Sequence, residues 1–184
     1  MPAGPRLRNK ARDSALPRLT LVLGGARSGK SRYAEELARA AGGKVVYIAT
    51  AEARDEEMRR RIAEHRRLRD KSWTTLEAPV ELAHALKGLE PGGPALVDCL
   101  TLWLSNVMLA KRDLVKDCDA LIDALMACRA PVIAVSNEVG QGVVPDTPLG
   151  RAFRDAQGIL NQRVAAIADR VVLTAAGLLL VLKG

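Results

Sequence analysis

A glycine-rich octapeptide directly after an apolar run limits the folds open to this chain more than any other segment. Residues 24–31 read Gly-Gly-Ala-Arg-Ser-Gly-Lys-Ser and fit the pattern G-x-x-x-x-G-K-[ST] without a mismatch. Gly24 and Gly29 free the backbone to wrap inward, so that successive N–H groups can point at phosphate oxygens. Lys30 adds a cation that reaches the β- and γ-phosphates, and Ser31 offers a hydroxyl to Mg²⁺. The segment therefore predicts a binding loop for a nucleoside triphosphate with Mg²⁺.

The sequence around this loop alternates between strand and helix patterns. Residues 19–23 predict a buried strand before the loop, and residues 32–38 predict a helix after it. Further strands are expected over 44–50, 73–77, 95–98, 131–136, 170–174 and 178–182, and helices over 52–69, 80–87, 100–110, 115–128 and 148–168. Gly150 and Gly158 weaken the last helix. We therefore expect an α/β fold of the phosphate-loop NTPase (RecA-like) type, a mostly parallel sheet flanked by helices, with an antiparallel edge hairpin across 175–177.

Size and composition indicate one globular domain. With 184 residues, of which 48% are hydrophobic and 27% charged, the chain is long enough for a full core. We expect residues 19–184 to form this domain, and residues 1–18, rich in proline and arginine, to form a disordered basic tail. The three cysteines are odd in number and lack C-x-x-C spacing, which argues against a disulfide framework or a zinc site and suits a cytoplasmic location.

Charge and apolar runs argue against two classes of partner. The net charge of +7 is compatible with nucleic-acid binding, but the aromatic content of 3% is too low for a base-stacking surface. Phosphate ligands explain the positive charge more simply. No apolar run reaches the roughly 18 residues that a membrane span needs. We therefore expect no nucleic-acid partner and no membrane span.

A second residue with metal-binding chemistry follows a short apolar run. Asp98 comes directly after Ala95-Leu96-Val97. Phosphate-loop enzymes place an acidic residue at such a strand end, where it holds Mg²⁺ directly or through water. Asp98 also precedes a predicted helix, so an N-cap is an alternative role. Ser31 and Asp98 are the predicted metal ligands.

One of the two histidines lies on the arginine-rich helix predicted over 52–69. His65 shares a helix face with Met58 and Ile62, the face expected to pack inward, and arginines flank it. Those arginines disfavour the imidazolium form, and a neutral imidazole can attack phosphorus. Spacing alone nevertheless favours a packed or surface histidine on a solvated basic helix. His84 has no comparable surroundings and is expected to be structural.

Four segments together resemble the bifunctional adenosylcobinamide kinase/adenosylcobinamide-phosphate guanylyltransferase family of cobalamin biosynthesis. They are residues 24–32; Tyr47-Ile48-Ala49-Thr50 with Glu57-Met58, Arg61-Ile62, His65-Arg66, Trp73 and Glu77; Asp98 to Asn106; and Ser136-Asn137-Glu138-Val139-Gly140 with Gly142 to Pro145, Arg154-Asp155, Gly158 and Asn161-Gln162. The second and fourth segments are the most specific, because ordinary phosphate-loop kinases lack them. The similarity extends from Leu19 to Lys183.

The resemblance implies two reactions. First, the γ-phosphate of ATP or GTP moves to a hydroxyl on the aminopropanol arm of adenosylcobinamide. His65 matches the histidine that then attacks the α-phosphorus of GTP and becomes guanylylated, before adenosylcobinamide-phosphate displaces it to give adenosylcobinamide-GDP. Lys30 and Mg²⁺ offset the charge of the transferring group. Family members form trimers, so the resemblance also implies a homo-oligomer.

The resemblance further implies a set of site residues. His65 and Lys30 are the catalytic residues. The nucleotide contacts are Gly24, Gly25, Ala26, Arg27, Ser28, Gly29, Lys30, Ser31, Thr50, Ala51, Glu52, Arg66, Arg67, Leu68, Arg69, Glu77 and Asp98. The chain departs from the family pattern at Asp70, where a proline is common, and in its extension before Leu19. Glu138 and Gln141 stay open between substrate contact and a structural turn.

Two other functions are compatible with parts of the sequence. A phosphate-loop kinase of another small metabolite explains the octapeptide and Asp98 but leaves the His65 segment unexplained. A non-catalytic nucleotide-dependent switch or RNA-binding module would use the basic helix and the tail. GTP labelled at the α-phosphate tests the first alternative, because an ordinary kinase takes up no label. The second alternative predicts salt-dependent RNA affinity without turnover.

Overall fold

The computed structural model describes residues 16–53, 56, 59–60 and 72–184, and seven strands of this part form one sheet in the order β3-β2-β4-β5-β1-β6-β7. The strands are β1 (Leu19–Gly24), β2 (Val45–Ala49), β3 (Trp73–Glu77), β4 (Ala95–Asp98), β5 (Val132–Asn137), β6 (Arg170–Ala175) and β7 (Leu178–Lys183). Neighbours from β3 to β6 pair in parallel, whereas β7 pairs antiparallel with β6. The mostly parallel sheet and its antiparallel edge hairpin are confirmed.

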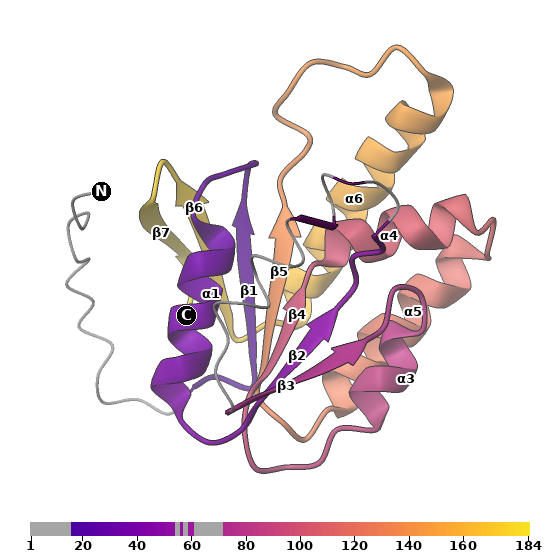
Figure 1. The fold of residues 1–184 in the computed structure, drawn as a ribbon. Coiled ribbons are helices and arrows are strands. Elements are labelled where there is room, and N and C mark those ends of the chain that lie inside the picture. Colours follow the sequence, from indigo (N-terminus) through magenta and orange to yellow (C-terminus); the bar gives the residue numbers. More distant parts are fainter. Residues whose placement is uncertain (1–15, 54–55, 57–58, 61–71) are drawn as a thin grey trace.

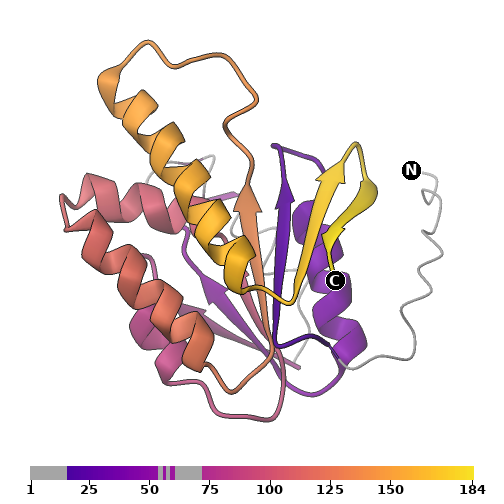
Figure 2. The same ribbon diagram turned by 180° about the vertical axis from the view of Figure 1, so that it is seen from behind.

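Helices cover both faces of the sheet (Figures 1 and 2). They are α1 (Lys30–Ala41), α3 (Leu82–Lys87), α4 (Leu100–Leu109), α5 (Leu114–Ala127) and α6 (Pro148–Ile167). Helix α1 lies on one face, and α3 to α6 lie on the other. Helix α6 runs through Gly150 and Gly158 without a break, because Thr147 caps it by accepting from the Gly150 amide at 3.1 Å and the apolar face is buried. Most of the helix predicted over 52–69 falls outside the described residues.

Alternate residues of the central strands pack on opposite faces. In β1, Leu19, Leu21 and Leu23 belong to the core on the side of α3 to α6, whereas Val22 belongs to the core on the side of α1. Leu96 of β4 likewise packs on the α1 side. In both strands, side chains two residues apart share a face, as expected for a β-strand. Because both faces are buried, the strands read as continuous apolar runs rather than as alternating ones.

The carboxyl ends of the parallel strands meet along one edge of the sheet. The pairs at this edge are Glu77 with Ala49, Ala49 with Asp98, Gly24 with Asn137, and Gly24 with Thr174. The β5–α6 connection (138–147) and the first turns of α6 extend beyond this edge (Figures 1 and 2). Ligands of open α/β sheets bind outside the carboxyl ends of the strands, so this edge is where a site is expected.

Among the residues the structure describes, no helix combines the length and apolar character that crossing a membrane requires. Cys99, Cys118 and Cys128 are buried free thiols. Burial raises the pKa of each thiol, and for Cys99 it does so to about 11. All three cysteines are therefore protonated core residues near neutral pH.

Candidate active site

The loop between β1 and α1 is a tight turn that leads into a helix N-terminus. The Ser28 amide donates to the Gly25 carbonyl at 3.3 Å, and the Tyr33 amide donates to the Gly29 carbonyl at 3.0 Å in the first turn of α1. Gly29 has a φ of 97°, a left-handed conformation that favours glycine. Nζ of Lys30 donates to the Gly25 carbonyl at 3.1 Å, so the ammonium lies over the loop. A cation beside a helix N-terminus suits a phosphate group.

The β6–β7 hairpin forms hydrogen bonds with this loop. Oγ1 of Thr174 donates its single proton to the Leu23 carbonyl at 3.0 Å. The 2.7 Å bond between the hydroxyls of Ser28 and Thr174 must therefore have Ser28 as its donor. The Gly177 amide also donates to the Ser28 carbonyl at 2.9 Å. The buried side chain of Ser28 thus holds the loop to β6, while its predicted contact with the nucleotide stays a prediction.

Gly24 is the loop position where a side chain is least tolerable. A Cβ there would overlap the hydroxyl oxygens of Thr174 and Ser28 and lie 2.6 Å from the Thr174 carbonyl oxygen. We expect Gly24→Ala to lower the free energy of unfolding by about 1–3 kcal/mol, because the backbone of β6 at Thr174 must shift to make room for the methyl group. Urea unfolding monitored by circular dichroism measures this loss, and binding of a GTP analogue reports the damage to the loop.

The matched control for Gly24→Ala is Gly158→Ala in α6. A Cβ at Gly158 meets nothing within 4 Å. An alanine in a helix interior loses less backbone entropy on folding than glycine, so this variant is expected to be unchanged or up to about 1 kcal/mol more stable. Equal unfolding midpoints for the two variants would contradict the crowding argument at Gly24.

Asp98 projects from the end of β4 toward the α1 side of the sheet. It lies two residues after Leu96, which packs in the core on that side, and its Oδ2 accepts from the Tyr47 hydroxyl at 3.3 Å. The N-cap of α4 is Cys99, which forms no side-chain cap, so the alternative role of Asp98 as a helix cap is wrong. After burial, the Asp98 charge is the largest cause that raises the pKa of Cys99, and Lys30 lowers it. The charges of Asp98 and Lys30 are therefore both close enough to Cys99 to affect its thiol.

Thr50, at the end of β2, is bound tightly within the fold. Its hydroxyl donates to the Cys99 carbonyl and accepts from the Cys99 amide, both at 2.7 Å. Nδ2 of Asn106 in α4 donates to the carbonyls of Thr50 and Pro79 at 2.8 and 3.0 Å. Thr50 therefore ties β2 to β4 and α4, and a nucleotide contact of its side chain stays a prediction. The sequence placed Asn106 in the third resemblance segment but assigned it no role.

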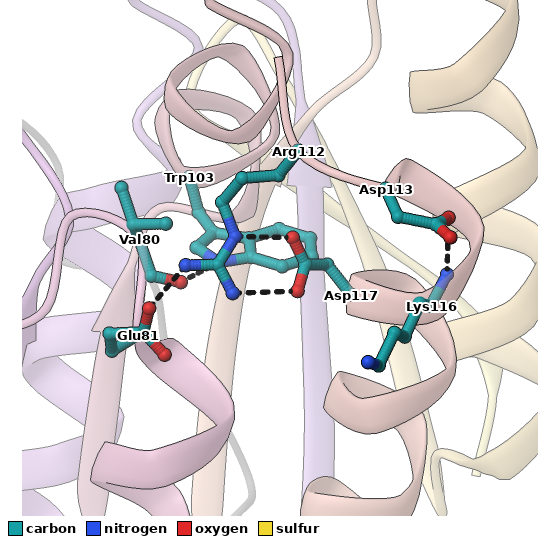
Figure 3. Close-up of polar contacts among 7 residues, drawn as sticks. All are labelled: Val80, Glu81, Trp103, Arg112, Asp113, Lys116 and Asp117. Carbon is teal, nitrogen blue, oxygen red and sulfur yellow. Dashed lines mark hydrogen bonds and ion pairs between the residues drawn. The ribbon is translucent and has the colours of Figure 1, made fainter. Parts of the chain in front are cut away.

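Helices α4 and α5 also hold the chain that follows β3 (Figure 3). Nε1 of Trp103 donates to the Val80 carbonyl at 2.8 Å. The Arg112 guanidinium binds both oxygens of Asp117, at 2.7 and 2.9 Å, and also contacts Glu81 just before α3. These two carboxylates raise the pKa of Arg112. The segment between β3 and α3 is therefore held at Val80 and at Glu81, directly before the N-terminus of α3.

Comparison with known proteins shows what this chain is related to. A family model described as "Cobinamide kinase / cobinamide phosphate guanyltransferase" matches residues 20–182. The chain belongs to this family. The bifunctional adenosylcobalamin biosynthesis protein CobP of Pseudomonas aeruginosa is 51% identical over 167 residues, which cover 89% of this chain and 96% of that protein. Its counterpart CobU of Salmonella typhimurium is 39% identical over 176 residues, which cover 87% of this chain and 97% of that protein.

Solved structures of lower identity show the fold alone. A type III secretion ATPase from pathogenic bacteria superposes with a TM-score of 0.57 at 15% identity, over 86% of this chain and 51% of that chain. The RadB recombinase superposes with a TM-score of 0.51 at 18% identity, over 87% of this chain and 76% of that chain. The expected phosphate-loop NTPase fold is thus confirmed for this member of the cobinamide kinase family.

The structure places the predicted site residues in two groups. The loop residues 24–31, the 50–52 segment, Glu77 and Asp98 all follow or end strands at the carboxyl edge of the sheet. His65, Arg66, Arg67, Leu68 and Arg69 lie outside the described residues, so their positions relative to the loop stay predictions. Thr174 was not singled out from the sequence, and Asn106 was part of the third resemblance segment without an assigned role. Both side chains act through contacts with residues far away in the sequence.

The donor set of this cobinamide kinase family member fits Mg²⁺. Ser31 and Asp98 offer a hydroxyl and a carboxylate, the hard oxygen ligands that Mg²⁺ prefers. No group of three or more His, Cys, Asp or Glu side chains that could hold a metal occurs in the part of the chain that the structure describes. Mg²⁺ at nucleotide sites is usually bound through one or two protein oxygens together with phosphates and water.

Proposed function

We propose that this chain phosphorylates adenosylcobinamide with ATP or GTP and then transfers GMP from GTP to adenosylcobinamide-phosphate, giving adenosylcobinamide-GDP. The family match over residues 20–182 carries the proposal, since it extends far beyond the phosphate loop. The loop geometry supports it, because Lys30 lies over a helix N-terminus that suits a phosphate group.

In the kinase step the substrate hydroxyl oxygen bonds to the γ-phosphorus as the bond to the β–γ bridging oxygen breaks. The electron pair of that bond leaves with the nucleoside diphosphate, and the hydroxyl proton passes to solvent. The loop amides and the Lys30 ammonium stabilise the charge on the transferring phosphoryl group. Mg²⁺ held by Ser31, Asp98 and phosphate oxygens would supply further electrostatic stabilisation.

In the transferase step a ring nitrogen of His65 bonds to the α-phosphorus of GTP, and pyrophosphate leaves with the electron pair of the broken P–O bond. A phosphate oxygen of adenosylcobinamide-phosphate then attacks the same phosphorus, and the imidazole leaves with the P–N electron pair. Two in-line displacements thus replace one difficult reaction between two anions. Glu77, the 50–52 segment and residues 66–69 are the proposed further nucleotide contacts.

Incubation of the purified protein with GTP labelled at the α-phosphate tests this function. We expect covalent label that survives denaturation in base and is lost in acid, as for a phosphoramidate, and that is released on adding adenosylcobinamide-phosphate. GTP labelled at the γ-phosphate should leave no covalent label and should label adenosylcobinamide. A protein that transfers the γ-label to another small metabolite, but takes up no α-label, would be an ordinary phosphate-loop kinase.

The proposed metal role of Asp98 predicts a changed magnesium requirement. Asp98→Asn keeps the shape of the side chain but removes the charge, so the Mg²⁺ concentration for half-maximal kinase activity is expected to rise about 10-fold or more. Asp123→Asn, an exposed position on α5, is the matched control and should leave the requirement unchanged. An unchanged magnesium titration for Asp98→Asn would remove Asp98 from the metal site.

We also propose that residues 19–184 act as one domain in a cytoplasmic homo-oligomer, a trimer as in the family, without a nucleic-acid partner. Adenosylcobinamide is large relative to a subunit of 184 residues, which favours a site shared between subunits. Light scattering on the purified protein tests the oligomeric state. A monomer with full activity would contradict a shared site.

A further inference from the structure

A buried carboxamide on α4 joins two strand ends at the point where their pairing stops. Asn106 is 5% exposed, and its Nδ2 donates to the Thr50 carbonyl at 2.8 Å and to the Pro79 carbonyl at 3.0 Å. A carboxamide NH₂ group carries two protons, so these two bonds use both of them. Thr50 directly follows β2, and Pro79 comes two residues after β3. One side chain therefore sets the spacing between the two segments that leave these strands.

The pairing of β2 with β3 ends directly before these two carbonyls. The Ala78 amide still donates to the Ala49 carbonyl at 2.8 Å, which continues the ladder by one bond. The Thr50 amide instead donates to the Asp98 carbonyl of β4 at 3.3 Å, on the other side of β2. The two chains thus separate here, and Asn106 bridges them at the point of separation.

Helix α4 holds this carboxamide in a fixed position. Most residues of the helix are buried, and its N-cap Cys99 forms two backbone bonds with the Thr50 hydroxyl. Three residues before Asn106, Nε1 of Trp103 donates to the Val80 carbonyl at 2.8 Å (Figure 3). The carboxamide therefore acts on the two strand ends from a well-anchored helix, which is the condition for precise positioning.

The two segments carry nucleotide contacts of the proposed function. The first contains residues 50–52, and Glu77 stands two residues before Pro79. The phosphate loop is held independently of them, because Ser28 is bonded to Thr174 of β6, on the other side of β1. A shift of the segments after β2 and β3 would therefore change these contacts and leave the loop in place.

We propose that Asn106 is a positioning residue for nucleotide binding. Its Nδ2 holds the Thr50 and Pro79 carbonyls at one spacing, and this spacing sets how the 50–52 segment and Glu77 face a bound nucleotide. Thr50 is fully buried, so without this donor its carbonyl must stay unpaired or shift toward another donor. The role rests on the nucleotide contacts of the proposed function, but not on the corrinoid substrate or on His65.

Titration of the full chain with the α,β-methylene analogue of GTP, with Mg²⁺ and without corrinoid, tests this role. The analogue cannot release pyrophosphate, so its binding is measured without transfer to the protein. Asn106→Leu has a similar volume but donates no hydrogen bond, and we expect it to raise the Kd of the analogue about 10-fold. Val107→Ala, at a buried core position of the same helix, lowers stability without removing a donor and should change the Kd by less than about 2-fold.

Amide hydrogen exchange shows where the variant changes the fold. The amides of Thr50 and Ala78 should exchange about 10-fold faster or more in Asn106→Leu, because they belong to the two segments that lose their bridge. The amides of Ser28 and Tyr33, in the phosphate loop and the first turn of α1, should keep their rates. Faster exchange at the two segments alone, together with a raised Kd, is the expected result.

A merely structural role for Asn106 predicts other results. Faster exchange at both segments with an unchanged Kd would overturn the proposal, because the spacing would then not matter to the nucleotide. Equal weakening of the analogue by Val107→Ala, or faster exchange in the loop as well, would overturn it too, since the effect would then come from lost stability. Should Asn106→Leu fail to fold, Asn106→Ala carries the same test. Absence of analogue binding by the unsubstituted protein would overturn the proposed function as well, whereas an unchanged Kd in the variant overturns the positioning role alone.

Discussion

Replacing His65 with alanine is expected to abolish GMP transfer while kinase activity stays measurable. The substitution removes the only nucleophile proposed for attack on the α-phosphorus, so transferase turnover should fall on the order of 10³-fold or more. In the proposed kinase step, γ-phosphoryl transfer depends on Lys30 and the loop amides instead, so its rate should change by less than about 10-fold. The measurement is covalent uptake of α-labelled GTP beside transfer of γ-label to adenosylcobinamide, in the same preparation.

The second histidine supplies the matched control. His84 lies exposed on α3, and His84→Ala should keep both activities. Radiolabelled GMP still attached to the His65→Ala protein would refute the assignment of the nucleophile. Equal loss of kinase and transferase activity would instead show that His65 supports the site as a whole.

Replacing Lys30 with methionine is expected to suppress both reactions. Methionine keeps most of the length of the side chain but removes the ammonium that is proposed to contact the β- and γ-phosphates, so kcat/KM of the kinase step should fall about 10²- to 10³-fold. Covalent guanylylation should fall as well, because the same charge stabilises the leaving pyrophosphate. Initial rates with each labelled GTP, at saturating Mg²⁺, measure both effects.

The free energy of unfolding of the Lys30→Met protein distinguishes the loss of the ammonium charge from misfolding. The bond from Lys30 Nζ to the Gly25 carbonyl is solvent-exposed, so its loss should change the free energy of unfolding by less than about 1 kcal/mol. Lys116→Met, an exposed position on α5, is the matched control and should leave both rates unchanged. A Lys30→Met protein that guanylylates His65 at the unsubstituted rate would exclude a role for this charge in the transferase step.

Local spacing accounts for much of the agreement between sequence and structure. The octapeptide at 24–31 predicts its turn and the helix after it, because glycine positions and the start of an apolar period are local properties. Element ends are less well predicted. Helix α3 was expected from residue 80 and begins at Leu82, since the Val80 carbonyl is bound by Trp103 of α4, 23 residues away. Strand β5 ends at Asn137, one residue beyond its predicted end.

The alternative roles of Asp98 show a choice that residue spacing in the sequence cannot make. As a sequence pattern, an acidic residue between a strand and a helix fits both a metal ligand and an N-cap. The structure excludes the cap, because Cys99 takes that position and Asp98 points to the α1 side of the sheet. The choice depends on strand phase and on where the helix starts, which tertiary packing sets.

The sequence by itself determined the phosphate loop, the alternating strands and helices, and the family, because these depend on residue types at fixed separations along the chain. Only the tertiary structure decided what surrounds the loop. Ser28 meets Thr174 across 146 residues, and Asn137 stands beside Gly24 because β5 and β1 pair in parallel at one register. Register is set by burial of both sheet faces at once, a property of the whole fold that no short pattern contains.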